Sequence, residues 1–135
     1  MGDEYITPSR TVTEADVVNF AGLSGDWSPV HTSAEDCKKG FGERIVHGAL
    51  TIVLAEGLQN RLNLWDESYM GLVDREWNFK SLVKFGDTLR VKIKIISKEA
   101  VSSYPSCGLI KRQIIIENQK GETVSEGVGT ILIKL

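Results

Sequence analysis

The second half of the chain alternates between apolar and polar positions, which is the pattern of half-buried β-strands. The clearest case is a strict alternation of apolar and charged side chains over residues 89–95: Leu89, Arg90, Val91, Lys92, Ile93, Lys94 and Ile95. Further strands are predicted over residues 71–79, 109–117 and 123–133. A polar turn over residues 118–121 joins the last two. The pattern therefore predicts a long antiparallel meander.

The first half of the chain lacks this alternation and reads as helices and loops. Thr13, followed by the acidic residues Glu14 and Asp16, is typical of an N-cap and predicts a helix through Leu23. Residues 24–29 are rich in turn-forming types, and Ser33 predicts the cap of a short second helix that ends at Gly40. A third helix, over residues 49–62, is apolar nearly all round its first two turns. Such a helix must be wrapped by other structure.

One buried helix ahead of a meander predicts an α+β protein in which a curved antiparallel sheet wraps a long central helix. That arrangement is the hot-dog fold, and 135 residues fit a single domain over residues 1–135. Exposed strand edges invite pairing. Branched apolar residues are also numerous on what we expect to be outer strands, so at least a homodimer is predicted (Ile110, Ile114, Ile116, Ile131 and Ile133).

Charge and composition exclude some partners. The net charge of −2 gives no support to a nucleic-acid partner. No stretch is long and apolar enough to span a membrane, and the N-terminus lacks the apolar core of a signal peptide. Cys37 and Cys107 lack metal-ligand spacing, and we interpret them as reduced thiols of a cytoplasmic protein.

The candidate chemistry lies in the loop before the second helix and at the start of the third. Asp26 and His31 stand five residues apart on a loop stiffened by Pro29, and together they can hold a water molecule. Gly48 opens the buried helix, so its backbone N–H can stabilise an enolate oxygen. This chemistry needs no metal and no cofactor. Alone, Asp26 is typical of a turn and His31 of a structural hydrogen bond.

The combined motif resembles the MaoC-like dehydratases, also called (R)-specific enoyl-CoA hydratases. The motif runs Gly25-Asp26-x-x-Pro29-x-His31 and then Ile45-x-His47-Gly48. The likeness continues through Phe79, residues 84–89 and the hairpin around Gly121 and Gly127. The resemblance implies a dimeric hot-dog lyase of fatty acid metabolism that adds water to trans-2-enoyl-CoA and forms (R)-3-hydroxyacyl-CoA. It makes Asp26 and His31 the catalytic dyad and Gly48 the oxyanion donor.

The resemblance also implies an acyl tunnel beside the central helix. Expected substrate contacts are Pro29, Val46, His47, Leu50, Glu56 and Trp77, and Val53, Leu54, Leu72 and Phe79 are further candidates for the lining. Bulk from Trp77 favours short acyl chains if its ring points inward. His47 has a second interpretation, because a histidine at a helix start can satisfy backbone groups. Five basic residues are candidates for the coenzyme A phosphates: Lys38, Lys39, Arg44, Lys80 and Lys84.

Glu56 departs from the family pattern, in which some relatives carry a serine there that hydrogen-bonds the catalytic histidine. Near His31 its carboxylate would raise the histidine pKa. Alternatively, Glu56 faces a dimer partner or a polar cavity.

Two other functions remain open on the same fold: an acyl-CoA thioesterase, and a non-catalytic acyl-thioester-binding protein. Within the hydratase interpretation, the carrier is coenzyme A or acyl carrier protein.

Overall fold

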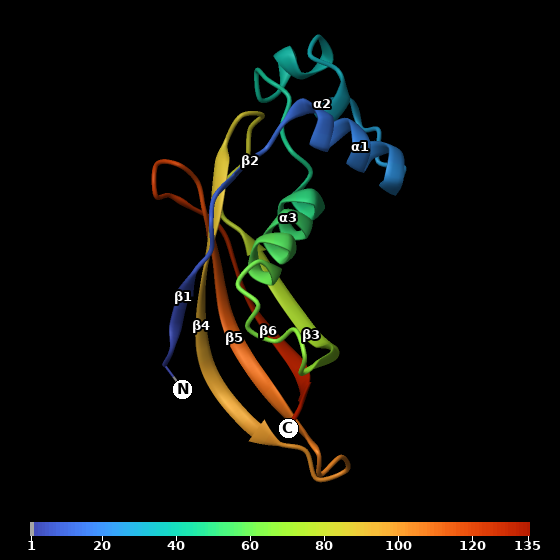
Figure 1. The fold of residues 1–135 in the computed structure, drawn as a ribbon. Helices are drawn as coiled ribbons and strands as arrows, with labels where there is room; N and C mark the ends of the chain where they lie inside the picture. The colour runs from blue at the N-terminus through green and yellow to red at the C-terminus, as the bar shows by residue number, and fades with distance from the viewer. Residues whose placement is uncertain (1) are drawn as a thin grey trace.

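In the computed structural model, which describes residues 2–135, a six-stranded antiparallel sheet curves around helix α3 (Gly48–Asn60) (Figure 1). The strands are β1 (Glu4–Ile6), β2 (Arg10–Thr11), β3 (Tyr69–Phe79), β4 (Thr88–Ala100), β5 (Cys107–Glu117) and β6 (Thr123–Lys134). The remaining elements are α1 (Glu14–Ser24), α2 (Pro29–Thr32) and the 3-10 turn η1 (Asp36–Lys39). This is the predicted hot-dog fold, with α1 and α2 gathered at one end of the sheet (Figure 1).

The strand order is β1-β4-β5-β6-β3, with β2 also paired to β4. Strands β4, β5 and β6 form the predicted meander. However, β3 does not continue it, since β3 crosses to the far edge and pairs with β6. The expectation that the first half contains only helices and loops is wrong, because β1 and β2 pair with β4. These strands have three and two residues, too few to show a period-2 pattern.

The core lies between the concave face of the sheet and α3. Leu50, Leu54 and Leu58 of the helix are buried there against the sheet. Four of the isoleucines expected on outer strands are buried in the same core: Ile110, Ile114, Ile116 and Ile131. That expectation was wrong because β5 and β6 are interior strands of the sheet. These residues therefore give no support to an oligomer.

Helix α3 is covered on one side only by the residues described. Its buried positions form one face (Leu50, Thr51, Leu54, Ala55, Leu58 and Gln59), whereas Val53 is 53% exposed. The prediction of a helix wrapped on all sides thus holds only for the face toward the sheet.

The N-terminal segments position the loop that carries Asp26. The predicted cap of α1 is confirmed: Thr13 and Asp16 form a capping box, in which each side chain accepts from the other residue's backbone N–H. Gly25 ends α1 in the left-handed conformation, with φ of 79°. The predicted second helix of residues 33–40 is reduced to η1, and the sequence missed α2.

Cys37 and Cys107 are buried free thiols. No helix within residues 2–135 has the length and apolar character needed to cross a membrane.

Candidate active site

Asp26 lies in the loop between α1 and α2, where Ser28 holds its carboxylate. Asp26 Oδ1 accepts from the Ser28 hydroxyl at 2.7 Å and from the Ser28 backbone N–H at 3.2 Å. These two bonds, the hydroxyl first, are the main cause that lowers the pKa of Asp26, and the nearby imidazoles of His31 and His47 lower it further. The carboxylate is therefore ionised at neutral pH while its side chain stays 47% exposed.

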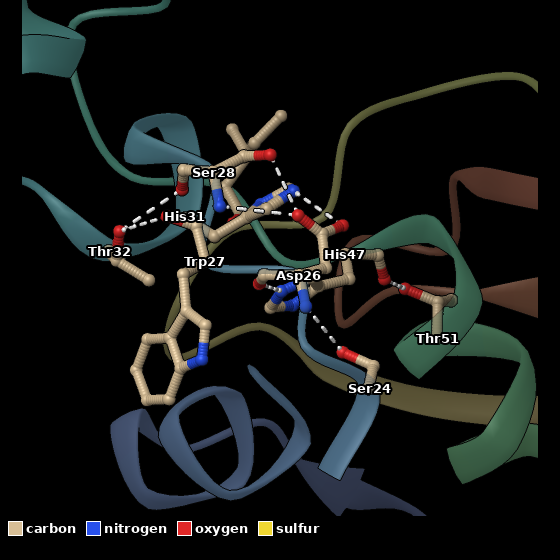
Figure 2. A network of polar contacts seen from close by, with 9 residues as sticks. Ser24, Asp26, Trp27, Ser28, His31, Thr32, His47 and Thr51 are labelled. Atoms are coloured by element: carbon tan, nitrogen blue, oxygen red, sulfur yellow. Dashed lines mark hydrogen bonds and ion pairs between the residues drawn. The ribbon is translucent and has the colours of Figure 1, made fainter. Parts of the chain in front are cut away.

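His31 lies on the single turn of α2, which begins at the exposed Pro29. His31 Nδ1 is 2.8 Å from the Ile45 carbonyl oxygen, and since a carbonyl can only accept, Nδ1 carries the proton. In the neutral ring, Nε2 then has the free lone pair. It faces Asp26 Oδ2 at 3.9 Å (Figure 2), which is too far for a direct hydrogen bond but suits a bridging water.

His47 is buried and contacts both Asp26 and His31. Its side chain is 2% exposed, and Nε2–H donates to the Asp26 backbone carbonyl at 3.0 Å (Figure 2). Its ring stacks on His31 with centroids 3.9 Å apart, and the Phe20 ring packs against its edge at 4.9 Å. This buried position favours the interpretation in which His47 satisfies a backbone group over a direct substrate contact.

Gly48 opens α3 beside the dyad. Within the described residues its backbone N–H has no hydrogen-bond acceptor, and it lies at the positive end of the helix dipole. A Cβ added to Gly48 would lie 3.0 Å from Cε1 of Phe79, so a glycine lets that ring approach closely.

A cleft of about 150 Å³ runs past His31 and Gly48. Of the expected substrate contacts, Val46 lines this cleft, whereas Leu50 is buried in the core. The sequence missed Thr51 and Ser125, which also line the cleft. Ser125 reaches the cleft because β6 pairs with β3 in a register that places Ser125 opposite Phe79. The sequence near Ser125 carries no signal of this register.

Trp77 points toward the helix side of the sheet, as the short-chain interpretation requires. Arg75, Trp77 and Phe79 alternate along β3 and so share one face. Trp77 packs partly buried against the core, and its ring lies over Gly127, where an added Cβ would come within 2.7 Å. The ring thus fills space next to the cleft along β3.

Glu56 does not line the cleft with His31. Its carboxylate pairs with the Arg75 guanidinium, and both line a separate pocket of about 480 Å³ toward the C-terminal end of α3. The sequence left three placements open for Glu56: near His31, at a dimer partner or in a polar cavity. The structure shows the polar cavity.

The five basic candidates for phosphate contacts are mostly engaged by acids. Lys38, Arg44, Lys80 and Lys84 each pair with a glutamate, namely Glu35, Glu14, Glu126 and Glu43 respectively. These pairs leave little free positive charge at those positions for a coenzyme A phosphate.

Asp26, His31 and His47 also place three potential metal-ligand atoms within 4.8 Å of one another. However, the two imidazoles are stacked at 27°, and their lone pairs lie in the ring planes. Rings in such nearly parallel planes cannot both direct a nitrogen lone pair at one ion at bonding distance, about 2.0–2.1 Å for zinc. The arrangement is suited to holding a water molecule rather than a cation.

A family model described as MaoC like domain matches residues 1–113, so the chain belongs to this family. It is 40% identical over 101 residues to Protein MaoC of Klebsiella aerogenes, covering 68% of this chain but only 28% of that protein. It is 28% identical over 131 residues to the (R)-specific enoyl-CoA hydratase of Rhodospirillum rubrum, covering 93% of this chain and 82% of that protein.

Among solved structures, a monoamine oxidase regulatory protein from Archaeoglobus superposes with a TM-score of 0.88 at 29% identity. The match covers 99% of this chain and 90% of that one.

Proposed function

We propose that this protein is a hydro-lyase that adds water to a trans-2-enoyl thioester and forms the (R)-3-hydroxyacyl thioester. One observation carries the proposal: His31 Nε2 faces Asp26 Oδ2 at 3.9 Å, beside a helix N-terminus whose Gly48 N–H has no acceptor in the described residues. The names of the relatives, among them an (R)-specific enoyl-CoA hydratase, favour the same reaction.

In the proposed mechanism, a water bridges Asp26 and His31 and its oxygen attacks the β-carbon. The dyad takes one proton from that water and returns one proton to the α-carbon, so the pair ends as it began. Nδ1 of His31 is held by Ile45, so Nε2 is the ring atom that exchanges the proton. Negative charge develops on the thioester oxygen, and the Gly48 N–H stabilises it.

The acyl group is proposed to be short. The cleft of about 150 Å³ is small, and the inward Trp77 ring fills the space beyond it along β3. Either coenzyme A or acyl carrier protein is compatible with a thioester whose carbonyl lies over Gly48.

The active unit is proposed to be a homodimer formed through β3. This strand ends the sheet and carries exposed apolar side chains outside both pockets, Met70 and Val73, that a second copy would cover.

The test is to incubate the purified protein with crotonyl-CoA while following the conjugated enoyl absorbance and the free thiol. A hydratase removes the absorbance without releasing thiol. Thiol release would indicate a thioesterase instead. Binding of crotonyl-CoA with neither change would favour a non-catalytic acyl-thioester-binding protein.

A further inference from the structure

In the part of the chain that the structure describes, the second pocket, toward the C-terminal end of α3, contains a buried guanidinium without a carboxylate partner and several hydrogen-bond donors without acceptors. Arg112 is 3% exposed, yet within the described residues its only side-chain partner is the neutral Gln59, whose Oε1 accepts from Nη1 at 2.9 Å. No carboxylate among residues 2–135 lies within ion-pair distance of Arg112. A buried and uncompensated charge is costly.

Arg75 lies next to it on the same side of the sheet. Burial and the charge of Arg112 lower the pKa of Arg75 to about 10, and Glu56 already neutralises this guanidinium. Buried donors without acceptors remain on three side chains: Arg75 Nε, Arg112 Nε and Gln59 Nε2. Among the pocket's carboxylates, Glu56 is paired and Asp66 is exposed at the surface, so neither neutralises Arg112.

The walls and size of this pocket suit an organic anion. Its volume of about 480 Å³ lies within the range of small-molecule sites. Trp65, Leu72 and Ile131 provide apolar lining, and the Arg112 guanidinium lies 6.0 Å from the Trp65 ring centroid. A guanidinium binds a carboxylate with parallel hydrogen bonds.

We infer that this pocket is an anion-binding site that takes the carboxylate of a small organic acid on Arg112. The carboxylate belongs to a free organic acid, because the Trp77 ring separates this pocket from the reaction cleft. The pocket and the cleft lie on the same face of β3 and β6, with Trp77 between them.

The first experiment measures the thermal unfolding midpoint with sodium glutarate, against sodium chloride at equal ionic strength. Gln59→Glu replaces the amide that accepts from Arg112 with a carboxylate, so the variant's own side chain neutralises the Arg112 charge. Gln113→Glu is the matched control, because Gln113 follows Arg112 on β5 and lines a groove on the opposite face of the sheet.

Glutarate is expected to raise the midpoint of wild type and Gln113→Glu by a few degrees and to leave Gln59→Glu unchanged. No shift in wild type, or equal shifts in all three proteins, would overturn the inference.

The second experiment checks that no acyl chain reaches the pocket, by comparing kcat/KM for hex-2-enedioyl-CoA and hex-2-enoyl-CoA. Because the Trp77 ring separates the pocket from the cleft, we expect the two kcat/KM values to differ by less than roughly tenfold. A larger preference for the acid-ended substrate that is lost in Gln59→Glu would place an acyl carboxylate on Arg112 and overturn the assignment to a free acid. If neither thioester is hydrated, the proposed function fails, while the glutarate result still decides whether the pocket binds a carboxylate.

Discussion

Gly48→Pro removes the single backbone N–H that is proposed to stabilise the thioester oxygen. Proline is well tolerated at the first position of a helix, and Gly48 is the first residue of α3. The preceding His47 has φ of −56° and ψ of 134°, the extended conformation that a residue before proline requires. The Gly48 N–H has no acceptor within the described residues, so the fold loses no hydrogen bond. We therefore expect the free energy of unfolding to change by no more than about 1 kcal/mol.

The expected effect on turnover is much larger. Removing one donor of an oxyanion hole costs about 10²–10³-fold in kcat. If the thioester oxygen accepts from the Gly48 N–H, Gly48→Pro should lose activity on that scale while its unfolding midpoint stays near that of wild type.

Gly48→Ala is the matched control, because it adds a Cβ and keeps the N–H. That Cβ would lie 3.0 Å from Cε1 of Phe79, but the Phe79 side chain is 56% exposed and can move. Alanine also gains up to about 0.5–1 kcal/mol in helix propensity, which offsets the crowding. The difference between the alanine and proline variants therefore measures the replacement of the N–H by the proline Cδ methylene.

The assay is the initial rate of enoyl absorbance loss with crotonyl-CoA for all three proteins, together with their unfolding midpoints. Equal activities of folded Gly48→Ala and Gly48→Pro would refute the reasoning, because the N–H would then carry no part of the reaction.

Two further predictions concern Asp26 and the packing of Trp77. Ser28→Ala removes the hydroxyl that contributes most to lowering the pKa of Asp26, so this pKa should rise and the acid limb of the pH–rate profile should move to higher pH. The lowered pKa of Asp26 contributes stability that is present above the unfolded-state pKa and is lost as the pH falls through the folded-state pKa. Ser28→Ala should therefore have a lower free energy of unfolding in urea at neutral pH than wild type. An unmoved acid limb would mean that Asp26 does not control the rate. Gly127→Ala should cost roughly 1–3 kcal/mol in urea unfolding, because its Cβ would lie 2.7 Å from the Trp77 ring and 2.5 Å from a backbone oxygen. Gly57→Ala in α3 has nothing within 4 Å and should gain about 0.5–1 kcal/mol; similar losses in both variants would contradict this account of the packing.

Features set by neighbouring residues could be predicted from the sequence. The capping box of Thr13 and Asp16, the alternation along β4 and the start of α3 all depend on spacings of two to four residues. The convergence of Asp26 and His31 is local in the same sense, since Pro29 begins the single helical turn between them.

Features set by distant pairing could not be predicted. The crossing of β3 to β6 brings Ser125 opposite Phe79, and nothing near either residue in the sequence encodes that pairing. Glu56 was ambiguous for the same reason, since its partner Arg75 lies on another element. The hydrogen bond from the Ser28 hydroxyl to Asp26 is local, however, because the two residues are two positions apart in a turn. Their spacing could have indicated this bond.

The most direct test of the central claim is a double-mutant cycle on the dyad, using Asp26→Asn, His31→Ala and the combined variant. The measurement is kcat/KM for hydration of crotonyl-CoA, with unfolding midpoints as the control for folding. If both side chains hold one water, each single variant should lose several orders of magnitude, and the double variant should lose little more than either. Near-normal activity in a single variant, or losses that simply multiply, would contradict a shared water between Asp26 and His31.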